Sequence, residues 1–306
     1  MPSDLNVRLD ADFIDVRDRA GIGLPFSKGI MATSILATGM ETARAHRIAA
    51  GVERDLRRRG ASRIEADELA EMAAEAIRGD AGEEFHDRYR AWRHAKRSGR
   101  PFVVCLGGAS GVGKSTLATR LAMRLGVNRV VTTDAIREVL RTVIPPTVLP
   151  ELHVSTFERI DDATSPTESF LRQARAVSAA TAAVVRRFFA EGRSSVVEGV
   201  HLLPGSIARE LKDTDAGGIV IELLLTLDDE VTHRGHLMRR RHSEPARDGT
   251  RHLEKFRAIR EMQAQLRGFA GRNGVIEFDI ARPGGLTQMI VDRLVERMER
   301  DSDGCS

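Results

Sequence analysis

Apolar and polar positions follow two different patterns along the chain, and the change falls near Pro101. Before it, apolar residues recur every three to four positions, which predicts amphipathic helices. After it, short apolar runs are separated by longer helical patterns. The runs predicted to be strands are 102–106, 129–132, 195–198, 219–227 and 275–280. Strands that alternate with helices predict right-handed βαβ units and a parallel sheet covered on both faces.

The change of pattern divides the chain into four predicted parts. Residues 25–97 form a small helical domain, residues 98–298 form an α/β domain, residues 1–24 are an N-terminal segment of uncertain structure, and residues 299–306 are a polar tail. The predicted fold is therefore α/β, with a five-stranded parallel sheet flanked by helices and preceded by a small all-α domain.

Composition adds limits on location and partners. With 306 residues, 42% hydrophobic and 30% charged, the chain has the composition of a globular protein. The net charge of +3 is too small to indicate a nucleic-acid partner. The sequence has neither a secretory signal nor an apolar stretch of about 18 residues, so we expect a cytoplasmic protein without a membrane partner. Cys105 and Cys305 do not have the spacing of metal ligands. The sequence leaves open whether the protein forms a homo-oligomer.

The segment GGASGVGKST follows the first strand of the α/β domain and precedes a helical pattern, as a P-loop requires. Its backbone N–H groups and Lys114 are expected to hold the phosphates of ATP, and the Ser115 hydroxyl to ligate Mg²⁺. The residues predicted to bind the nucleotide are Gly108, Ala109, Ser110, Gly111, Val112, Gly113, Lys114, Ser115 and Thr116.

The third strand ends at Glu198, and His201 follows three positions later. The two could be an acid/base pair, two metal ligands or residues without a role. Glu198 stands at the Walker B position, where Asp is usual, so we expect it to hold Mg²⁺ through water or to contact the acceptor hydroxyl. Asp134, at the end of the second strand, is the competing candidate for the base. Alternatively, Asp134 only caps the N-terminus of the following helix. We expect His201 to contact an anionic acceptor rather than a metal.

Two groups of arginines point to an anionic, hydroxyl-bearing acceptor. Arg137 and Arg141 share one helix face after Asp134, where they could bind carboxylate or phosphate or simply be solvated. A second group follows the fourth strand, where a lid could place guanidinium groups on the transferring phosphoryl group. Its members are Arg234, Arg239, Arg240, Arg241, Arg247 and Arg251, with Arg239 to Arg241 the candidates for that contact. A nucleic-acid patch is disfavoured because no aromatic residues are interleaved.

A P-loop does not identify the acceptor, so several classes of protein stay open. A GTPase is disfavoured because no Asn-Lys-x-Asp follows a later strand. A small-molecule kinase, a toxin-like or regulatory kinase acting on a protein or nucleotide sugar, and a nucleotide-binding switch without turnover all fit the motif.

Several segments together resemble the 2-phosphoglycerate kinase family. They are PFSKGI, RPFVVCLGGASGVGKST, VVTTDAIREVLR, LPELHVSTFE, FLRQARAV and VVEGVHLLPG. The resemblance implies an ATP-cone-like helical domain joined to a P-loop domain of the nucleotide-kinase type. It also implies phosphorylation of 2-phosphoglycerate by ATP to 2,3-bisphosphoglycerate, with another anionic hydroxy acid as the alternative acceptor.

The resemblance adds residues to the predicted acceptor site. It assigns His153, Ser155 and Thr156, in LPELHVSTFE, to the acceptor anion beside Arg137, Arg141 and His201. It also implies that Lys28 could serve allosteric nucleotide binding in the helical domain. The alternative is that this domain only packs against the rest of the chain.

Overall fold

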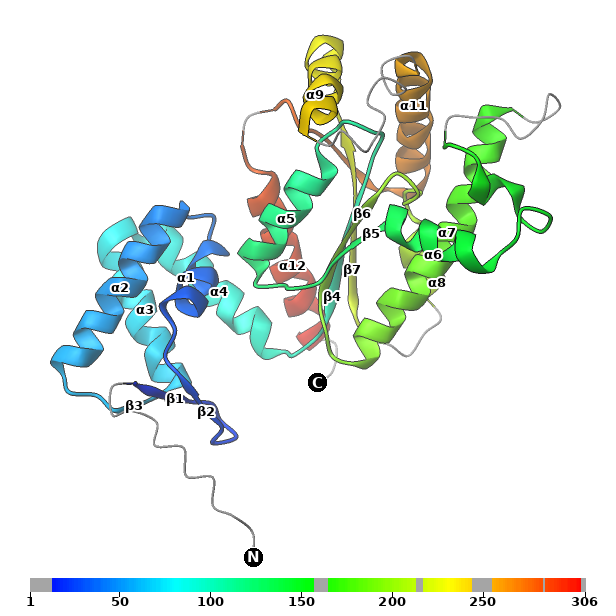
Figure 1. Cartoon of the computed structure of the whole chain (residues 1–306). Coiled ribbons are helices and arrows are strands. Elements are labelled where there is room, and N and C mark those ends of the chain that lie inside the picture. The colour runs from blue at the N-terminus through cyan, green and yellow to red at the C-terminus, as the bar shows by residue number, and fades with distance from the viewer. Residues whose placement is uncertain (1–12, 157–164, 213–216, 244–254, 283, 304–306) are drawn as a thin grey trace, which may run out of the picture. The chain divides into compact units, whose positions relative to one another are not determined.

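The computed structural model describes residues 13–156, 165–212, 217–243, 255–282 and 284–303, with the side chains of 240–243 and 301–303 left out. Arg247, Arg251 and the end of the predicted polar tail lie outside the described residues. The chain divides into a smaller unit, residues 1–95 with 124–126, and a larger unit, residues 96–123 with 127–306. Figure 1 shows the elements of both units.

The larger unit is built on a sheet of five parallel strands in the order β5-β6-β4-β7-β8. Each predicted strand is present within one or two residues of its expected bounds. The strands are β4 (Phe102–Gly107), β5 (Val130–Thr132), β6 (Ser195–Gly199), β7 (Ile219–Thr226) and β8 (Ile276–Asp279). In a parallel sheet all carboxyl ends lie at one edge, and Gly107, Thr132, Gly199 and Thr226 meet there.

Helices cover both faces of this sheet, with α5 and α12 on one face and α6, α7 and α8 on the other (Figure 1). The helices are α5 (Lys114–Leu125), α6 (Thr133–Val143), α7 (Pro166–Ala190), α8 (Ser206–Leu211), α9 (Glu230–Ser243), α11 (Phe256–Asn273) and α12 (Leu286–Asp303), with a 3₁₀ turn, η1 (Pro150–His153). Helix α9 follows β7, where the sequence predicts a lid.

Burial and capping explain why these elements form. The central strands β4 and β6 are buried at every residue, as expected of apolar runs covered on both faces. Helix α6 begins at an N-cap, Thr132, whose hydroxyl accepts from the Ala135 N–H at 3.2 Å. Ser165 caps α7 in the same way, ahead of Pro166. The N-cap alternative for Asp134 is therefore wrong.

The smaller unit is not purely helical, which corrects the predicted all-α domain. A three-stranded sheet, β1 (Asp15–Arg17), β2 (Gly23–Pro25) and β3 (Arg63–Glu65), joins helices α1 (Lys28–Leu36), α2 (Thr42–Arg58), α3 (Ala66–Ala81) and α4 (Glu83–Arg97). Part of the predicted N-terminal segment therefore belongs to this unit. Each strand has only three residues, too few for period-two patterning to be recognised in the sequence. Ile14 and Ile64 join the apolar core.

Lys28 makes an ion pair within this unit. Its Nζ lies 3.1 Å from Glu53 Oε2, and the hydrogen bond to Lys28 lowers the pKa of Glu53. The side chain of Lys28 is half-exposed. Nucleotide binding through Lys28 stays a prediction.

Candidate active site

The loop between β4 and α5 is fixed by buried side chains and by glycine. Ala109 and Val112 are fully buried. Gly111 has φ +85°, and a Cβ there would lie 2.6 Å from Leu237 Cδ2, so the loop excludes larger residues at this position. Lys114 Nζ donates a hydrogen bond to the Ala109 carbonyl at 2.9 Å, which places the ammonium group over the loop. A glycine-rich loop that ends at a helix N-terminus can bind phosphate.

Ser115 and Glu198 meet beside this loop. Ser115 Oγ donates to Glu198 Oε1 at 2.8 Å, because β4 and β6 are neighbours and Leu106 is in register with Glu198. Glu198 is only 6% exposed, so its carboxylate is held where water has little access. A hydroxyl and a carboxylate at this distance are oxygen donors of the kind that Mg²⁺ accepts. The two residues therefore fit the predicted metal site.

Gly199 lets the start of α6 approach β6 closely. A Cβ on Gly199 would lie 1.7 Å from Thr133 Oγ1. Thr133 is fully buried, whereas the next residue, Asp134, has a side chain that is 58% exposed. The close approach therefore brings one exposed carboxylate to the carboxyl edge of the sheet, beside the strand that carries Glu198.

His201 is fully buried, and both of its ring nitrogens have partners. Nδ1 lies 3.0 Å from Thr133 Oγ1, and Nε2 lies 2.9 Å from Gln173 Oε1. The amide nitrogen of Gln173 donates to the backbone carbonyls of Glu151 and Val154, so Oε1 is the acceptor. The proton of the neutral imidazole therefore sits on Nε2, and Nδ1 accepts from the threonine hydroxyl.

These surroundings correct the predicted role of His201. Burial lowers its pKa to about 4, although the carboxylate of Asp134, 3.7 Å from Nδ1, acts in the opposite direction. The ring is therefore neutral at pH 7 and offers no charge to an anion. His201 instead lies under Asp134 and supports the start of α6 through Thr133.

Arg137 has a supporting role that the sequence did not predict. Its Nη2 donates to the carbonyls of Leu152 and Val154, at 2.8 and 2.6 Å. Burial and the neighbouring Arg141 lower its pKa, but a guanidinium remains charged at pH 7. Arg137 therefore holds the segment from Leu152 to Val154 that leads to Ser155, and its contact with the acceptor stays a prediction.

The other predicted acceptor residues lie around this segment. His153 Nε2 donates to the Ile144 carbonyl at 2.8 Å, and Arg141 pairs with Glu138 at 2.9 Å. In the described part of the chain, the buried Nε atoms of Arg137 and Arg141 have no hydrogen-bond partner. Two such donors on adjacent turns of α6 leave positive potential beside Asp134, as an anionic acceptor would need.

Helix α9 is joined to the P-loop by two histidines that the sequence did not single out. His233 Nε2 donates to the Ser110 carbonyl at 2.8 Å, and His236 Nδ1 to the Gly111 carbonyl at 3.1 Å. His233 is buried against Phe256, and burial lowers its pKa, so it acts as a neutral donor. Changes in the position of α9 would therefore act directly on the P-loop.

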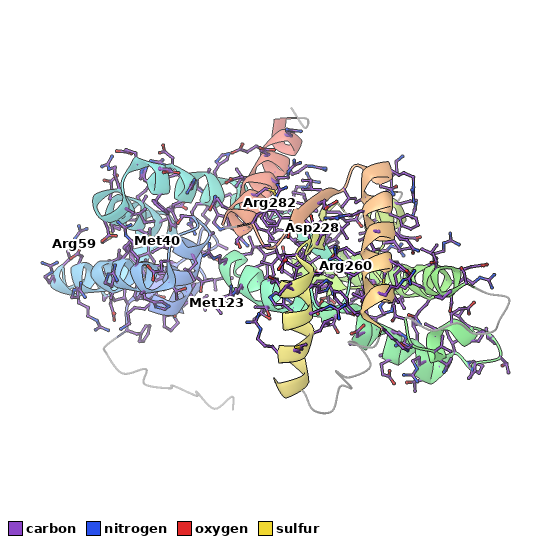
Figure 2. All side chains as sticks on the ribbon, turned by 90° about the horizontal axis from the view of Figure 1, so that it is seen from above. Met40, Arg59, Met123, Asp228, Arg260 and Arg282 are labelled. Carbon is purple, nitrogen blue, oxygen red and sulfur yellow. The ribbon has the colours of Figure 1, made fainter. Side chains whose placement is uncertain are left out.

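Arg260, from α11, fixes the turn that leads into α9. It donates to the carbonyls of Leu227 and Asp228, at 2.6 and 3.1 Å, and Figure 2 shows Arg260 and Asp228 in this region. Arg239 lies on α9 and is exposed. The side chains of Arg240 and Arg241 lie outside the described part, so their contact with a phosphoryl group stays a prediction.

The chain is similar to several curated proteins called 2-phosphoglycerate kinase. It is 35% identical to the one from Methanopyrus kandleri over 78% of this chain and 74% of that protein. The identity is 32% to the one from Methanothermobacter thermautotrophicus, over 82% and 84% of the two chains. No family model matches the sequence.

The chain belongs to the 2-phosphoglycerate kinase family. Members of this family are kinases, and the P-loop described above is the nucleotide site expected of an ATP-dependent phosphotransferase. A gluconokinase from Sinorhizobium meliloti aligns with a TM-score of 0.36 at 15% identity, over 67% of this chain and 95% of that chain. A shikimate kinase from Acinetobacter baumannii aligns with a TM-score of 0.35 at 14% identity, over 68% and 98%.

In this member of the 2-phosphoglycerate kinase family, the structure brings Lys114, Ser115, Glu198 and Asp134 to one edge of the sheet. The supporting residues Thr133, Gln173, His233, His236 and Arg260 were missed by the sequence analysis. Gln173 lies within FLRQARAV, and its contacts cross 28 residues to His201, which no local spacing reveals. None of the described helices is long and apolar enough to cross a membrane.

Proposed function

We propose that the chain transfers the γ-phosphoryl group of ATP to the free hydroxyl of 2-phosphoglycerate, giving 2,3-bisphosphoglycerate. The observation that carries this proposal is the meeting of Ser115 and Glu198 beside the P-loop, with Asp134 at the adjacent strand end, in a chain of this family. Phosphoryl transfer depends mainly on positioning and electrostatic stabilisation. This edge of the sheet supplies groups for both.

The residues of the P-loop would bind the nucleotide. Backbone N–H groups of residues 108–113 and the ammonium of Lys114 would hold the β- and γ-phosphates, and Lys114 would exchange its bond to Ala109 for phosphate oxygens. Ser115 and Glu198 would hold Mg²⁺, with Glu198 acting directly or through water. Mg²⁺ supplies charge neutralisation on the phosphates when it is bound.

Asp134 would accept the proton of the acceptor hydroxyl. Its exposed carboxylate can approach a ligand, while Glu198 is buried against Ser115. The neutral ring of His201 lies behind Asp134 and does not compete as a charged partner. We therefore assign the base role to Asp134 and the metal role to Glu198.

The acceptor anion would lie between α6 and the segment after η1. Arg141, His153 and Ser155 are the side chains proposed to contact it, with Arg137 positioning that segment through backbone carbonyls. Arg239 and Arg240, on α9, would approach the phosphoryl group as it is transferred. A small anionic substrate in the cytoplasm is the partner that this arrangement would serve.

The test is ADP release from ATP with a panel of hydroxy acids: 2-phosphoglycerate, 3-phosphoglycerate, glycerate, gluconate and shikimate. We expect kcat/KM to be highest for 2-phosphoglycerate. Asp134→Asn should lower kcat by about 100-fold or more, the typical contribution of a positioned base. Asp292→Asn, on α12, is the matched control and should leave kcat unchanged. Preference for another acid would overturn the acceptor assignment, and full activity of Asp134→Asn would overturn its role.

A further inference from the structure

A cavity of about 450 Å³ lies among α7, α8 and α11 in the larger unit, and none of its lining residues belongs to the transfer site described above. Cavities of this size commonly hold small metabolites. Three of the lining side chains are arginines, one from each helix: Arg175, Arg209 and Arg272. Glu210 is the only carboxylate in the lining, so the charged groups sum to +2, three positive minus one negative.

Several surface arginines of the larger unit form ion pairs, whereas the three arginines of the cavity form none within the part of the chain that the structure describes. Arg187 pairs with Glu191 at 2.7 Å, and Arg257 pairs with Glu261 at 2.9 Å. In the described part of the chain, Arg175, Arg209 and Arg272 form no ion pair; the guanidinium of Arg272 lies 4.6 Å from the centroid of the Phe269 ring. Arg209 also interacts through charge with the buried carboxyl of Glu222. Guanidinium groups that line one concave surface without forming ion pairs suit phosphate groups.

The start of α8 does not account for this positive charge. Glu222, from β7, accepts a hydrogen bond from the Ile207 N–H at 2.9 Å and interacts with the N–H groups of Gly205 and Ala208. The backbone donors of this short helix are therefore already used. The charge of the cavity comes from the three arginine side chains.

The inner wall of the cavity is polar and ordered. Ser206 Oγ donates to Ser178 Oγ at 3.3 Å, and Ser178 Oγ donates to the His201 carbonyl at 2.7 Å. Both serines are buried. The ring of the same His201 lies beside Asp134, 3.7 Å from its carboxylate. His201 does not line the cavity, but it connects the serines of the cavity wall to the transfer site.

We propose that this cavity binds a small phosphorylated metabolite at a site separate from the site of phosphoryl transfer. The arginines of α7, α8 and α11 bind its phosphate groups, and the buried serines form the inner wall. The proposal does not depend on which acceptor the transfer site uses. Because changes in the cavity could alter activity indirectly through His201, the test measures binding.

The experiment is isothermal titration calorimetry of inorganic pyrophosphate into the full chain, with Mg²⁺ and one equivalent of a non-hydrolysable ATP analogue present. We expect saturable binding that Arg175→Gln/Arg209→Gln weakens by at least about tenfold, the effect of losing about 1.4 kcal/mol. The control Arg187→Gln/Arg300→Gln removes the same charge from outside the cavity and should retain the affinity within about threefold. If the cavity double variant does not fold, Arg209→Gln alone replaces it.

A second control separates the cavity from the acceptor side. Arg141→Gln should leave unchanged the part of pyrophosphate binding that the cavity variant removes. The proposal is overturned if the wild-type chain shows no saturable binding or if the charge-matched control weakens binding as much as the cavity variant does. It is also overturned if Arg141→Gln removes binding while the cavity variant retains it.

Discussion

Asp134 and His201 have an oxygen and a nitrogen only 3.7 Å apart, but burial gives the two residues different chemistry. Asp134 is exposed at the start of α6, and His201 is enclosed and neutral. The sequence could predict that both follow strands at the ligand-binding edge. It could not predict the burial of His201, because that depends on Gln173, from a helix 28 residues earlier.

The neutral state of His201 predicts a pH dependence of stability. The pKa of His201 in the folded protein, about 4, lies below the ordinary value of 6.5. The stability that the neutral imidazole contributes is therefore fully present above about pH 6.5 and is lost as the pH falls toward 4. Between about pH 7.5 and about pH 5, this group lowers the free energy of unfolding by about 2 kcal/mol. Urea unfolding at both pH values should show a smaller loss in His201→Gln than in wild type. An equal decrease in the free energy of unfolding in wild type and His201→Gln would contradict the buried neutral imidazole. The control is His46→Gln, at an exposed position on α2, which should behave like wild type.

The close approach of Gly199 to Thr133 predicts the effect of adding a single methyl group. Gly199→Ala places a Cβ 1.7 Å from Thr133 Oγ1, so the start of α6 must shift, at a cost of about 1–3 kcal/mol or more in the free energy of unfolding. Gly271→Ala, in α11, meets nothing within 4 Å and should be neutral or slightly stabilising. Chemical denaturation compares the two variants, and equal stability would contradict the described packing of α6 on β6.

At the scale of elements, the P-loop is held by α9 as well as by its own strand and helix. The P-loop and the five strands could be predicted because their signals are local: a motif and short apolar runs. The contact of α9 with the loop crosses 123 residues between Ser110 and His233, so it has no sequence signature. The arginines and their place after the fourth strand predicted a lid in this region. The described contacts with the P-loop are made by the two histidines, while Arg234 lies over the ring of Phe256 at 4.1 Å.

Loss of the His233 contact should weaken nucleotide binding. His233→Phe keeps a ring against Phe256 but leaves the Ser110 carbonyl without its donor, which costs about 1–3 kcal/mol if the carbonyl stays buried. We expect KM for ATP to rise about fivefold or more, with a smaller change in KM for the acceptor. Steady-state kinetics measure both values. Arg257→Gln, exposed on α11, should change neither; an unaltered KM for ATP in His233→Phe would show that α9 does not position the loop.

At the scale of the whole molecule, the chain consists of two units, each with its own core. The periodicity of apolar residues changes near Pro101, close to the division between the units at residues 95 and 96. The three short strands of the smaller unit could not be predicted, because three residues are too few to display the alternation of apolar and polar positions. Residues Asp15 to Arg17 pair with Arg63 to Glu65, far along the chain, so their role is visible only in the structure.

The core of the smaller unit predicts that residues 13–97 fold alone. Ile35, Leu56 and Ile77 are almost completely buried within it. We expect helical circular dichroism and a cooperative thermal transition from this fragment. Ile35→Asp should abolish the transition, because a charge would replace a fully buried side chain. A disordered spectrum from the unmodified fragment would show that this unit depends on the rest of the chain.

The central claim is that the P-loop edge transfers phosphate to 2-phosphoglycerate, and phosphorus NMR of the reaction tests it most directly. The purified chain, ATP, Mg²⁺ and 2-phosphoglycerate should give ADP and an equal amount of a glycerate carrying two phosphate monoesters. Lys114→Ala, folded by circular dichroism, should give neither. The claim would be contradicted if ATP were converted only to ADP and inorganic phosphate. It would also be contradicted if the folded wild-type chain consumed ATP while 2-phosphoglycerate remained unchanged.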